Sequence, residues 1–143
     1  MLYKKIFLSL SGKEDESRAI QECMRIVMAL KAELTVIHVN DPAAGYAHMM
    51  MDTLPKTTVA EMEEMFAKAG FGSQANEIGF RLVEDESYAA AIAAATREAD
   101  LLIMGHHSKN LLMAHLKDGT DERVADLIHC PVLLVPLKQG IAD

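Results

Sequence analysis

The feature that most restricts the fold of this 143-residue chain is a repeated alternation between short aliphatic runs and helical hydrophobic patterns. Within each run the aliphatic residues follow one another directly, which indicates strands covered on both faces. Strands of this kind, separated by helices, are typical of an α/β protein with a parallel sheet between two layers of helices. The five runs lie at residues 6–10, 34–39, 78–83, 101–104 and 132–135.

Between the runs, apolar residues recur every three or four positions, as on the buried face of an amphipathic helix. The acidic residues 14–16 are expected in the first turn of the first helix, where they suit the helix dipole, and Gly70 marks the end of the second. The third helix is Ala-rich and is expected over residues 88–98, and Thr120 or Asp121 begins the last. The predicted stripes are Ile20, Cys23, Met24, Val27 and Leu30 in the first helix, Val59, Met62, Phe66 and Ala69 in the second, and Val124, Leu127 and Ile128 in the last.

Length and composition indicate one domain over residues 1–143, because a chain of this size with half of its residues hydrophobic can build its own core. The 14 basic and 21 acidic side chains leave a net charge of -7, which argues against nucleic acid as a partner. No apolar stretch approaches the length of a membrane span, and the first run ends at Ser11 and Gly12 without a signal-peptide cleavage pattern. A cytoplasmic protein without membrane contact is therefore expected, with Cys23 and Cys130 as reduced core residues.

Ligands of open parallel sheets bind beyond the carboxyl ends of the strands, where the strand order reverses. Four segments follow predicted strands and are therefore candidates: residues 11–12, 39–41, 84–87 and 105–120. The last is the most unusual, because it carries glycines and hydroxyls just before a helix begins, and backbone N–H groups in such loops can hold a phosphate. A glycine-bearing loop that enters a helix is, however, most often only a loop.

Four phrases of the sequence stand in an order and spacing that characterise a known family. They are KKIFL at 4–8, LTVIHV at 34–39, ADLLIMG at 99–105 and CPVLLVP at 130–136. Together they resemble the universal stress protein family over essentially the whole chain. The resemblance implies a five-stranded sheet of order 3-2-1-4-5, in which Ser11 lies beside Gly105. It also implies a homodimer that forms through the last strand, which consists of Val132, Leu133, Leu134 and Val135.

Members of that family that bind ATP carry the motif G-x-x-G-x(9)-G-[S/T] after the fourth strand and an Asp at the end of the first. In this chain Gly105 matches the first glycine, but Ser108 and Asp118 stand where the second and third glycines belong. Gly119 stands where the Ser or Thr belongs, and Ser11 replaces the Asp. A side chain at position 108 narrows the backbone approach that a phosphate needs, and the carboxylate at position 118 would repel phosphates.

These departures favour a dimeric stress-response regulatory or interaction module that does not bind ATP in the family's usual way and has no catalytic turnover. Its further partner, a protein or a small molecule, is not defined by the sequence. The alternative is a nucleotide-binding member of the family with a degenerate phosphate loop, which binds ATP and hydrolyses it slowly. In that alternative the nucleotide is held by Ser11, Gly12, Val39, Gly105, Ser108, Gly119 and Thr120.

The adjacent His106 and His107 suggest a third and weaker hypothesis, a metal site. A zinc site needs three or four ligands, and the sequence does not position His115 or His129 to complete one, so a polar loop is the favoured interpretation. The chain has no nucleophile elbow, Walker motif or dinucleotide motif, and no catalytic residue is assigned. His38, at the end of a predicted strand, is expected to hydrogen-bond to the backbone.

The irregular segment 42–57 contains three consecutive methionines, which belong either to an adaptable contact surface or to the core. The acidic clusters 14–16 and 84–86 lie at the carboxyl ends of predicted strands. Together with Asp118 they are expected to make that end of the sheet acidic, which again disfavours a nucleotide.

Overall fold

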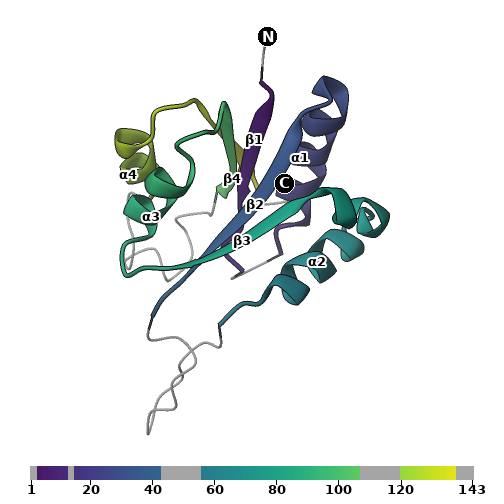
Figure 1. Ribbon diagram of the computed structural model, residues 1–143, viewed down its shortest axis with the longest axis horizontal. Helices are drawn as coiled ribbons and strands as arrows, with labels where there is room; N and C mark the ends of the chain where they lie inside the picture. Colours follow the sequence, from purple (N-terminus) through teal and green to yellow (C-terminus); the bar gives the residue numbers. More distant parts are fainter. Residues whose placement is uncertain (1–2, 13–14, 43–55, 107–119, 138–143) are drawn as a thin grey trace, which may run out of the picture.

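The computed structural model describes residues 3–12, 15–42, 56–106 and 120–137, which form one five-stranded sheet with helices on both faces (Figure 1). All neighbouring strands run parallel in the order β3-β2-β1-β4-β5, which confirms the predicted fold class and strand order. The strands are β1 (Lys5–Ser9), β2 (Glu33–Asn40), β3 (Gly79–Glu84), β4 (Leu101–His106) and β5 (Val132–Pro136). The helices are α1 (Ser17–Leu30), α2 (Val59–Lys68), α3 (Tyr88–Ala95) and α4 (Thr120–Leu127), with a short 3₁₀ helix, Gly72–Glu77, before β3.

The central strand β1 contributes to the core on both faces of the sheet. Helices α1 and α2 cover one face, and α3 and α4 cover the other (Figure 1). Ile6 and Leu8 pack in the first layer and Phe7 packs in the second, and all three are nearly inaccessible to solvent. Burial on both faces explains why this strand shows no polar alternation in its sequence.

The helices are less completely buried at their ends than the predicted stripes suggested. Leu30, Val59 and Leu127 are 39%, 37% and 52% exposed, which corrects their assignment to the core. Each is the first or last residue of its helix, so a neighbouring helical turn shields it on one side only. In the residues that the structure describes, no helix has both the length and the apolar character needed to cross a bilayer.

The fourth strand is longer than predicted. It continues to His106, so Gly105 belongs to the strand and not to the loop that follows. In that position Gly105 pairs with Val135 of β5. The hydrogen-bonded ladder between β4 and β5 therefore holds the first glycine of the predicted phosphate loop.

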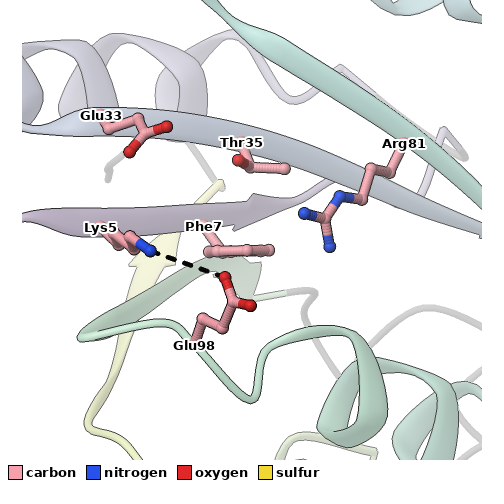
Figure 2. Close-up of a pocket in the computed structure, with 6 residues that line it drawn as sticks. All are labelled: Lys5, Phe7, Glu33, Thr35, Arg81 and Glu98. Carbon is pink, nitrogen blue, oxygen red and sulfur yellow. Dashed lines mark ion pairs between the residues drawn. The ribbon is translucent and has the colours of Figure 1, made fainter.

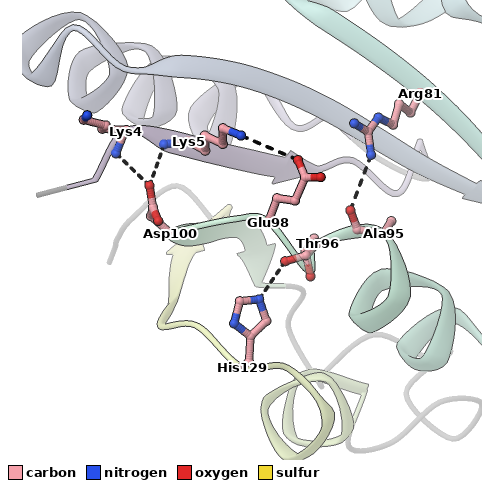
Figure 3. Close-up of polar contacts among 8 residues, drawn as sticks. All are labelled: Lys4, Lys5, Arg81, Ala95, Thr96, Glu98, Asp100 and His129. Carbon is pink, nitrogen blue, oxygen red and sulfur yellow. Dashed lines mark hydrogen bonds and ion pairs between the residues drawn. The ribbon is translucent and has the colours of Figure 1, made fainter.

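Helix α3 ends at Ala95, three residues earlier than predicted, and a set of side-chain bonds holds the turn that follows. The Thr96 hydroxyl donates to the carbonyl oxygen of Ile92 at 2.8 Å. The carbonyl oxygen of Thr96 in turn accepts from Nε2 of His129 at 3.0 Å (Figure 3). This turn brings the chain from α3 to the start of β4.

Asp100 joins the amino ends of β1 and β4. Its Oδ2 accepts hydrogen bonds from the backbone N–H groups of Lys5 at 2.8 Å and Lys4 at 2.9 Å (Figure 3). Its own N–H donates to the carbonyl oxygen of Lys5 at 2.8 Å. The backbone bond from Lys5, followed by the one from Lys4, lowers the pKa of the Asp100 carboxyl below its ordinary value of 3.8. The acidic residue before the fourth strand thus has a structural role in aligning the two central strands.

We predict that Asp100→Asn destabilises the protein at neutral pH but much less in acid. A carboxyl whose pKa is lowered by folding stabilises the native state above its ordinary value of 3.8, and this contribution is lost as the pH falls through the lowered folded pKa. Urea unfolding at a series of pH values should show that the difference in unfolding free energy between wild type and variant shrinks as the pH falls below 3.8. Glu98→Gln is the control, since its ion pair with Lys5, at 3.6 Å, is exposed. A difference in unfolding free energy that stays constant with pH would contradict a stabilising role for the Asp100 carboxylate.

Candidate functional site

The strand order reverses between β1 and β4, and several predicted site residues meet at the carboxyl end of these strands. Ser9 pairs with Met104, so Ser11, two residues later, lies at the same end of the sheet as Gly105. Gly12 follows Ser11, and Val39 lies near the end of the neighbouring strand β2. Ser108 and Gly119 fall outside the described residues, as do His107, His115, Asp118 and the three consecutive methionines, whereas Thr120 is the first residue of α4.

A buried carboxylate occupies the hydrogen-bond donors just beyond β1. Glu16 is 4% exposed. The backbone N–H of Ser11 donates to both its Oε1 and its Oε2 at 3.0 Å, and that of Gly12 donates to Oε1 at 3.0 Å. The Ser11 hydroxyl donates to Oε2 at 3.2 Å. The predicted Ser11 and Gly12 site therefore already contacts an acidic group of the same chain.

The position of Glu16 corrects the expected role of the acidic cluster 14–16. Helix α1 begins at Ser17 and has no acidic residue in its first turn. Glu16 is the residue that precedes the helix, and its side chain makes no capping hydrogen bond to α1. Instead, its side chain turns back toward the end of β1.

His38, Asn40 and Thr57 connect the ends of β1 and β2 with the start of α2. The imidazole Nδ1 of His38 donates to the carbonyl oxygen of Leu10 at 2.6 Å, which confirms the predicted bond to backbone. Its Nε2 lies 3.1 Å from Oδ1 of Asn40. Oδ1 of Asn40 accepts from the N–H of Thr57 at 3.0 Å, and its Nδ2 donates to the carbonyl oxygen of Thr57 at 3.1 Å. Since His38 and Asn40 are buried, these bonds fix the geometry of this end of the sheet.

Gly12 is required by conformation and by space. Its φ of +74° lies in the left-handed region, which residues other than glycine adopt only at a cost in free energy. A Cβ at this position would lie 3.2 Å from Oγ1 of Thr57 and 3.5 Å from Cε1 of His38. The structure of the loop alone therefore accounts for this glycine.

Gly105 also has an explanation in packing. A Cβ on this residue would lie 2.8 Å and 3.0 Å from the two methyl carbons of Leu137. Leu137 packs against the core layer that includes Ile103 and Val135. The absence of a side chain at Gly105 thus admits Leu137, and this glycine does not by itself indicate a phosphate site.

Several acidic side chains lie where β1, β2 and β3 end. Glu16 follows β1 and Asp41 follows β2, while Glu84 is the last residue of β3 and Asp85 comes after it. Lys56 forms an ion pair with Glu84 at 2.5 Å, which offsets one of these charges. The described residues therefore agree with the expectation of an acidic carboxyl end, and such an end repels phosphates unless cations intervene.

The residues considered for metal binding or nucleophilic chemistry have structural surroundings. Within the described ranges, no three His, Cys, Asp or Glu side chains are arranged to hold a metal ion. Burial raises the pKa of the Cys23 thiol to about 12, and burial followed by the nearby Asp100 raises that of Cys130. Thiols of this kind are poor nucleophiles.

A hydrogen bond between the Ser9 hydroxyl and the Tyr88 hydroxyl, which the sequence did not suggest, joins β1 to α3.

A small groove lies at the opposite, amino end of the sheet. Figure 2 shows Lys5 paired with Glu98 on one side and the Arg81 guanidinium near the Phe7 ring on the other. The guanidinium carbon of Arg81 lies 5.4 Å from the centre of that ring. Arg81 also donates to the carbonyl oxygen of Ala95 at 3.4 Å (Figure 3). The groove encloses about 50 Å³, which suits a few waters and not a nucleotide. Its lining consists of Lys5, Phe7, Glu33, Thr35, Arg81 and Glu98.

Five parallel strands whose order reverses between β1 and β4 define an open, doubly wound α/β protein. The model of the universal stress protein family matches residues 2–136. The chain therefore belongs to the universal stress protein family, which confirms the resemblance carried by its four sequence phrases.

Individual relatives agree with this assignment. The universal stress protein MJ0531 of Methanocaldococcus jannaschii is 29% identical over 147 residues, which cover 94% of this chain and 82% of that protein. A universal stress protein solved in complex with cAMP matches 96% of this chain and all of its own (100%), with a TM-score of 0.66 and 19% identity. The universal stress protein from Archaeoglobus fulgidus in complex with dAMP matches 94% of this chain and 99% of its own, with a TM-score of 0.58 and 14% identity. At these identities the two structures show a shared fold.

We predict that Gly12→Ala destabilises the protein more than Gly70→Ala. Both glycines have a positive φ, so each substitution costs about 1–2 kcal/mol of unfolding free energy in backbone strain. At Gly12 the new methyl also presses on Thr57 and His38, which adds about 1 kcal/mol, whereas at Gly70 no atom of the described residues, the two chain neighbours aside, lies within 4 Å. Urea unfolding of the two variants measures the difference. Equal losses would mean that the contact with Thr57 does not restrict this loop.

Proposed function

We propose that this chain, over residues 1–143, is a stress-response regulatory or interaction module of the universal stress protein family. In this proposal it acts as a homodimer in the cytoplasm, has no catalytic turnover and does not bind ATP in the family's usual way. The two unpaired cysteines, Cys23 and Cys130, support a reducing compartment.

The observation that carries the proposal is the Glu16 carboxylate at the end of β1. A nucleotide bound at this switch point would need polar partners there, and the N–H groups of Ser11 and Gly12 already donate to Glu16. Asp41 and Asp85, which follow β2 and β3, add negative charge at the same carboxyl end of the sheet. A triphosphate would have to approach against these charges.

The sequence after β4 supports the same proposal. Ser108 and Asp118 replace two glycines of the family's ATP motif. The glycine that is retained, Gly105, lies against Leu137 and is explained by packing. Positions 105, 108 and 118 therefore give no support for a phosphate-binding site.

A second candidate, nucleotide binding with a degenerate phosphate loop, has one observation in its favour. The family's ATP binders have an Asp where this chain has Ser11, and the Glu16 carboxylate lies 3.2 Å from the Ser11 hydroxyl, so an acidic group is still present at that place. Two proteins of similar fold were solved with cAMP and with dAMP. However, Glu16 is 4% exposed and already accepts several hydrogen bonds, which leaves it poorly placed to contact a ligand.

We predict that freshly purified protein, denatured and examined by mass spectrometry, releases no ATP, ADP or AMP. Millimolar ATP with Mg²⁺ should likewise leave the thermal unfolding midpoint unchanged, because a ligand that does not bind the native state cannot stabilise it. Co-purified nucleotide, or a midpoint that rises with ATP concentration, would favour the second candidate instead.

The β5 edge supports the proposed homodimer. Among the residues that the structure describes, strand β5 pairs with β4 on one side and no described strand pairs with its other edge. Leu133 and Leu134 are 38% and 40% exposed, and an open edge with exposed apolar side chains is suited to pairing with a second copy.

Leu134→Pro is predicted to give a monomer that keeps its fold. The carbonyl oxygen of Pro131 accepts from Leu102, so alternate residues from Pro131 onward face β4, while the N–H of Leu134 faces the open edge. Proline at position 134 therefore removes a donor of the edge and spares the ladder with β4. Sedimentation velocity measures the state, and circular dichroism checks the fold. A folded dimer of this variant would place the interface elsewhere.

A further inference from the structure

We propose that His38 is the centre of a pH-dependent switch that ties the end of β2 to the start of α2 while its imidazole ring is protonated and releases it when the ring becomes neutral. The switch consists of His38 and Asn40, both on β2, and Thr57, which precedes the N-cap residue of α2. It lies within one chain and operates whether or not the proposed function holds.

Both ring nitrogens of His38 face an oxygen that can only accept. Nδ1 lies 2.6 Å from the carbonyl oxygen of Leu10, and Nε2 lies 3.1 Å from Oδ1 of Asn40. A neutral imidazole has one N–H and can satisfy one of these oxygens, whereas an imidazolium donates to both. Because His38 is 6% exposed, a ring nitrogen that opposed an oxygen lone pair here would be costly. The observed arrangement is therefore that of the protonated ring.

The Asn40 amide cannot turn to suit a neutral ring without losing its other bonds. Its Oδ1 accepts from the N–H of Thr57 at 3.0 Å, and its Nδ2 donates to the carbonyl oxygen of Thr57 at 3.1 Å. A turned amide would offer Nδ2 to the ring, but it would also set a donor against the Thr57 N–H and an acceptor against the Thr57 carbonyl oxygen. The backbone of Thr57 thus fixes the orientation of the amide, and the amide in turn requires a proton on Nε2 of His38.

This coupling gives the carboxyl end of β2 two arrangements. With a protonated ring, Leu10, Asn40 and Thr57 are all bonded. With a neutral ring, Nδ1 keeps the bond to Leu10, Nε2 accepts from the turned Asn40 amide, and Thr57 is released. Helix α2 itself is held separately, by the capping box between Thr58 and Glu61. A rise in pH therefore frees the entry to α2 and leaves the helix intact.

The charges around the switch are mainly negative. On β3, the residue paired with His38 is the apolar Leu82. The Glu16 carboxylate accepts from Gly12, and an added Cβ on Gly12 would lie 3.5 Å from Cε1 of the His38 ring. Lys56 is paired with Glu84, so the surroundings suit a cation in the ring. The titratable groups of the segments that meet at this end of the sheet are Asp15, Glu16, Arg18, Asp41, Lys56, Glu61, Glu84, Asp85 and His106.

The test is a nuclear magnetic resonance titration of the full chain from about pH 5 to about pH 9, which follows the ring nitrogens of His38 and the backbone amide of Thr57 together. His129 is the internal control, because its Nε2 contacts the carbonyl oxygen of Thr96 and a neutral ring with its proton on Nε2 makes that bond equally well. His38→Gln removes the titrating ring and keeps a group that can donate to Leu10. Asn40→Asp keeps the acceptor and makes it a carboxylate.

We expect both ring nitrogens of His38 to carry a proton at the acid end, and the Thr57 signal to move with the midpoint of His38 and not with that of His129. Asn40→Asp should raise the His38 midpoint by about one pH unit or more, because a neighbouring carboxylate favours the imidazolium. In His38→Gln the movement of the Thr57 signal should disappear.

The wild-type titration alone can overturn the switch, whether or not the variants fold. It does so if His38 stays neutral throughout, or if the ring titrates while the Thr57 signal stays in place. A Thr57 signal that moves equally in His38→Gln would mean that another group is responsible and would also overturn it.

Discussion

The structure depends on how the central strand β1 is held at its two ends. At the amino end, Asp100 accepts from the backbone N–H groups of Lys4 and Lys5 and so aligns β1 with β4. At the carboxyl end, His38 donates to the carbonyl oxygen of Leu10, and Glu16 accepts from the residues that follow. Backbone groups just beyond the sheet ladder have no partner in a neighbouring strand, so they bond to water or to side chains of other segments. Asp100, His38 and Glu16 supply such partners.

The same requirement shapes the functional end of the sheet. In an open parallel sheet, the backbone groups left beyond the strand ends at the switch point are those available to a ligand. Here Glu16 takes the donors beyond β1, while Asn40 and Thr57 bond to each other beyond β2. The chain thus keeps the architecture of the universal stress protein family while its own side chains satisfy groups that a ligand would otherwise contact.

Sequence periodicity predicted the elements well and their ends poorly. Unalternated aliphatic runs identified all five strands, because a strand buried on both faces has little choice of residue type. The pattern could not show that β4 extends through Gly105, since a glycine carries no periodic signal, nor that Leu30 is exposed at the end of its helix. An acidic residue near a helix start generally suits the helix dipole, so the sequence predicts that role for Glu16. That its side chain turns back to Ser11 and Gly12 depends on contacts that the sequence does not show. Asp100 and Asn40 stood next to predicted strands, but their partners are distant in sequence.

Nuclear magnetic resonance of the backbone amides of Ser11 and Gly12 tests whether Glu16 closes the end of β1 in the wild-type protein. These two N–H groups donate to Glu16, so their signals report on any ligand that replaces it. If Glu16 keeps these donors, both signals stay in place as AMP, or ATP with Mg²⁺, is added to millimolar concentration. Saturable movement of these two signals would contradict closure by Glu16.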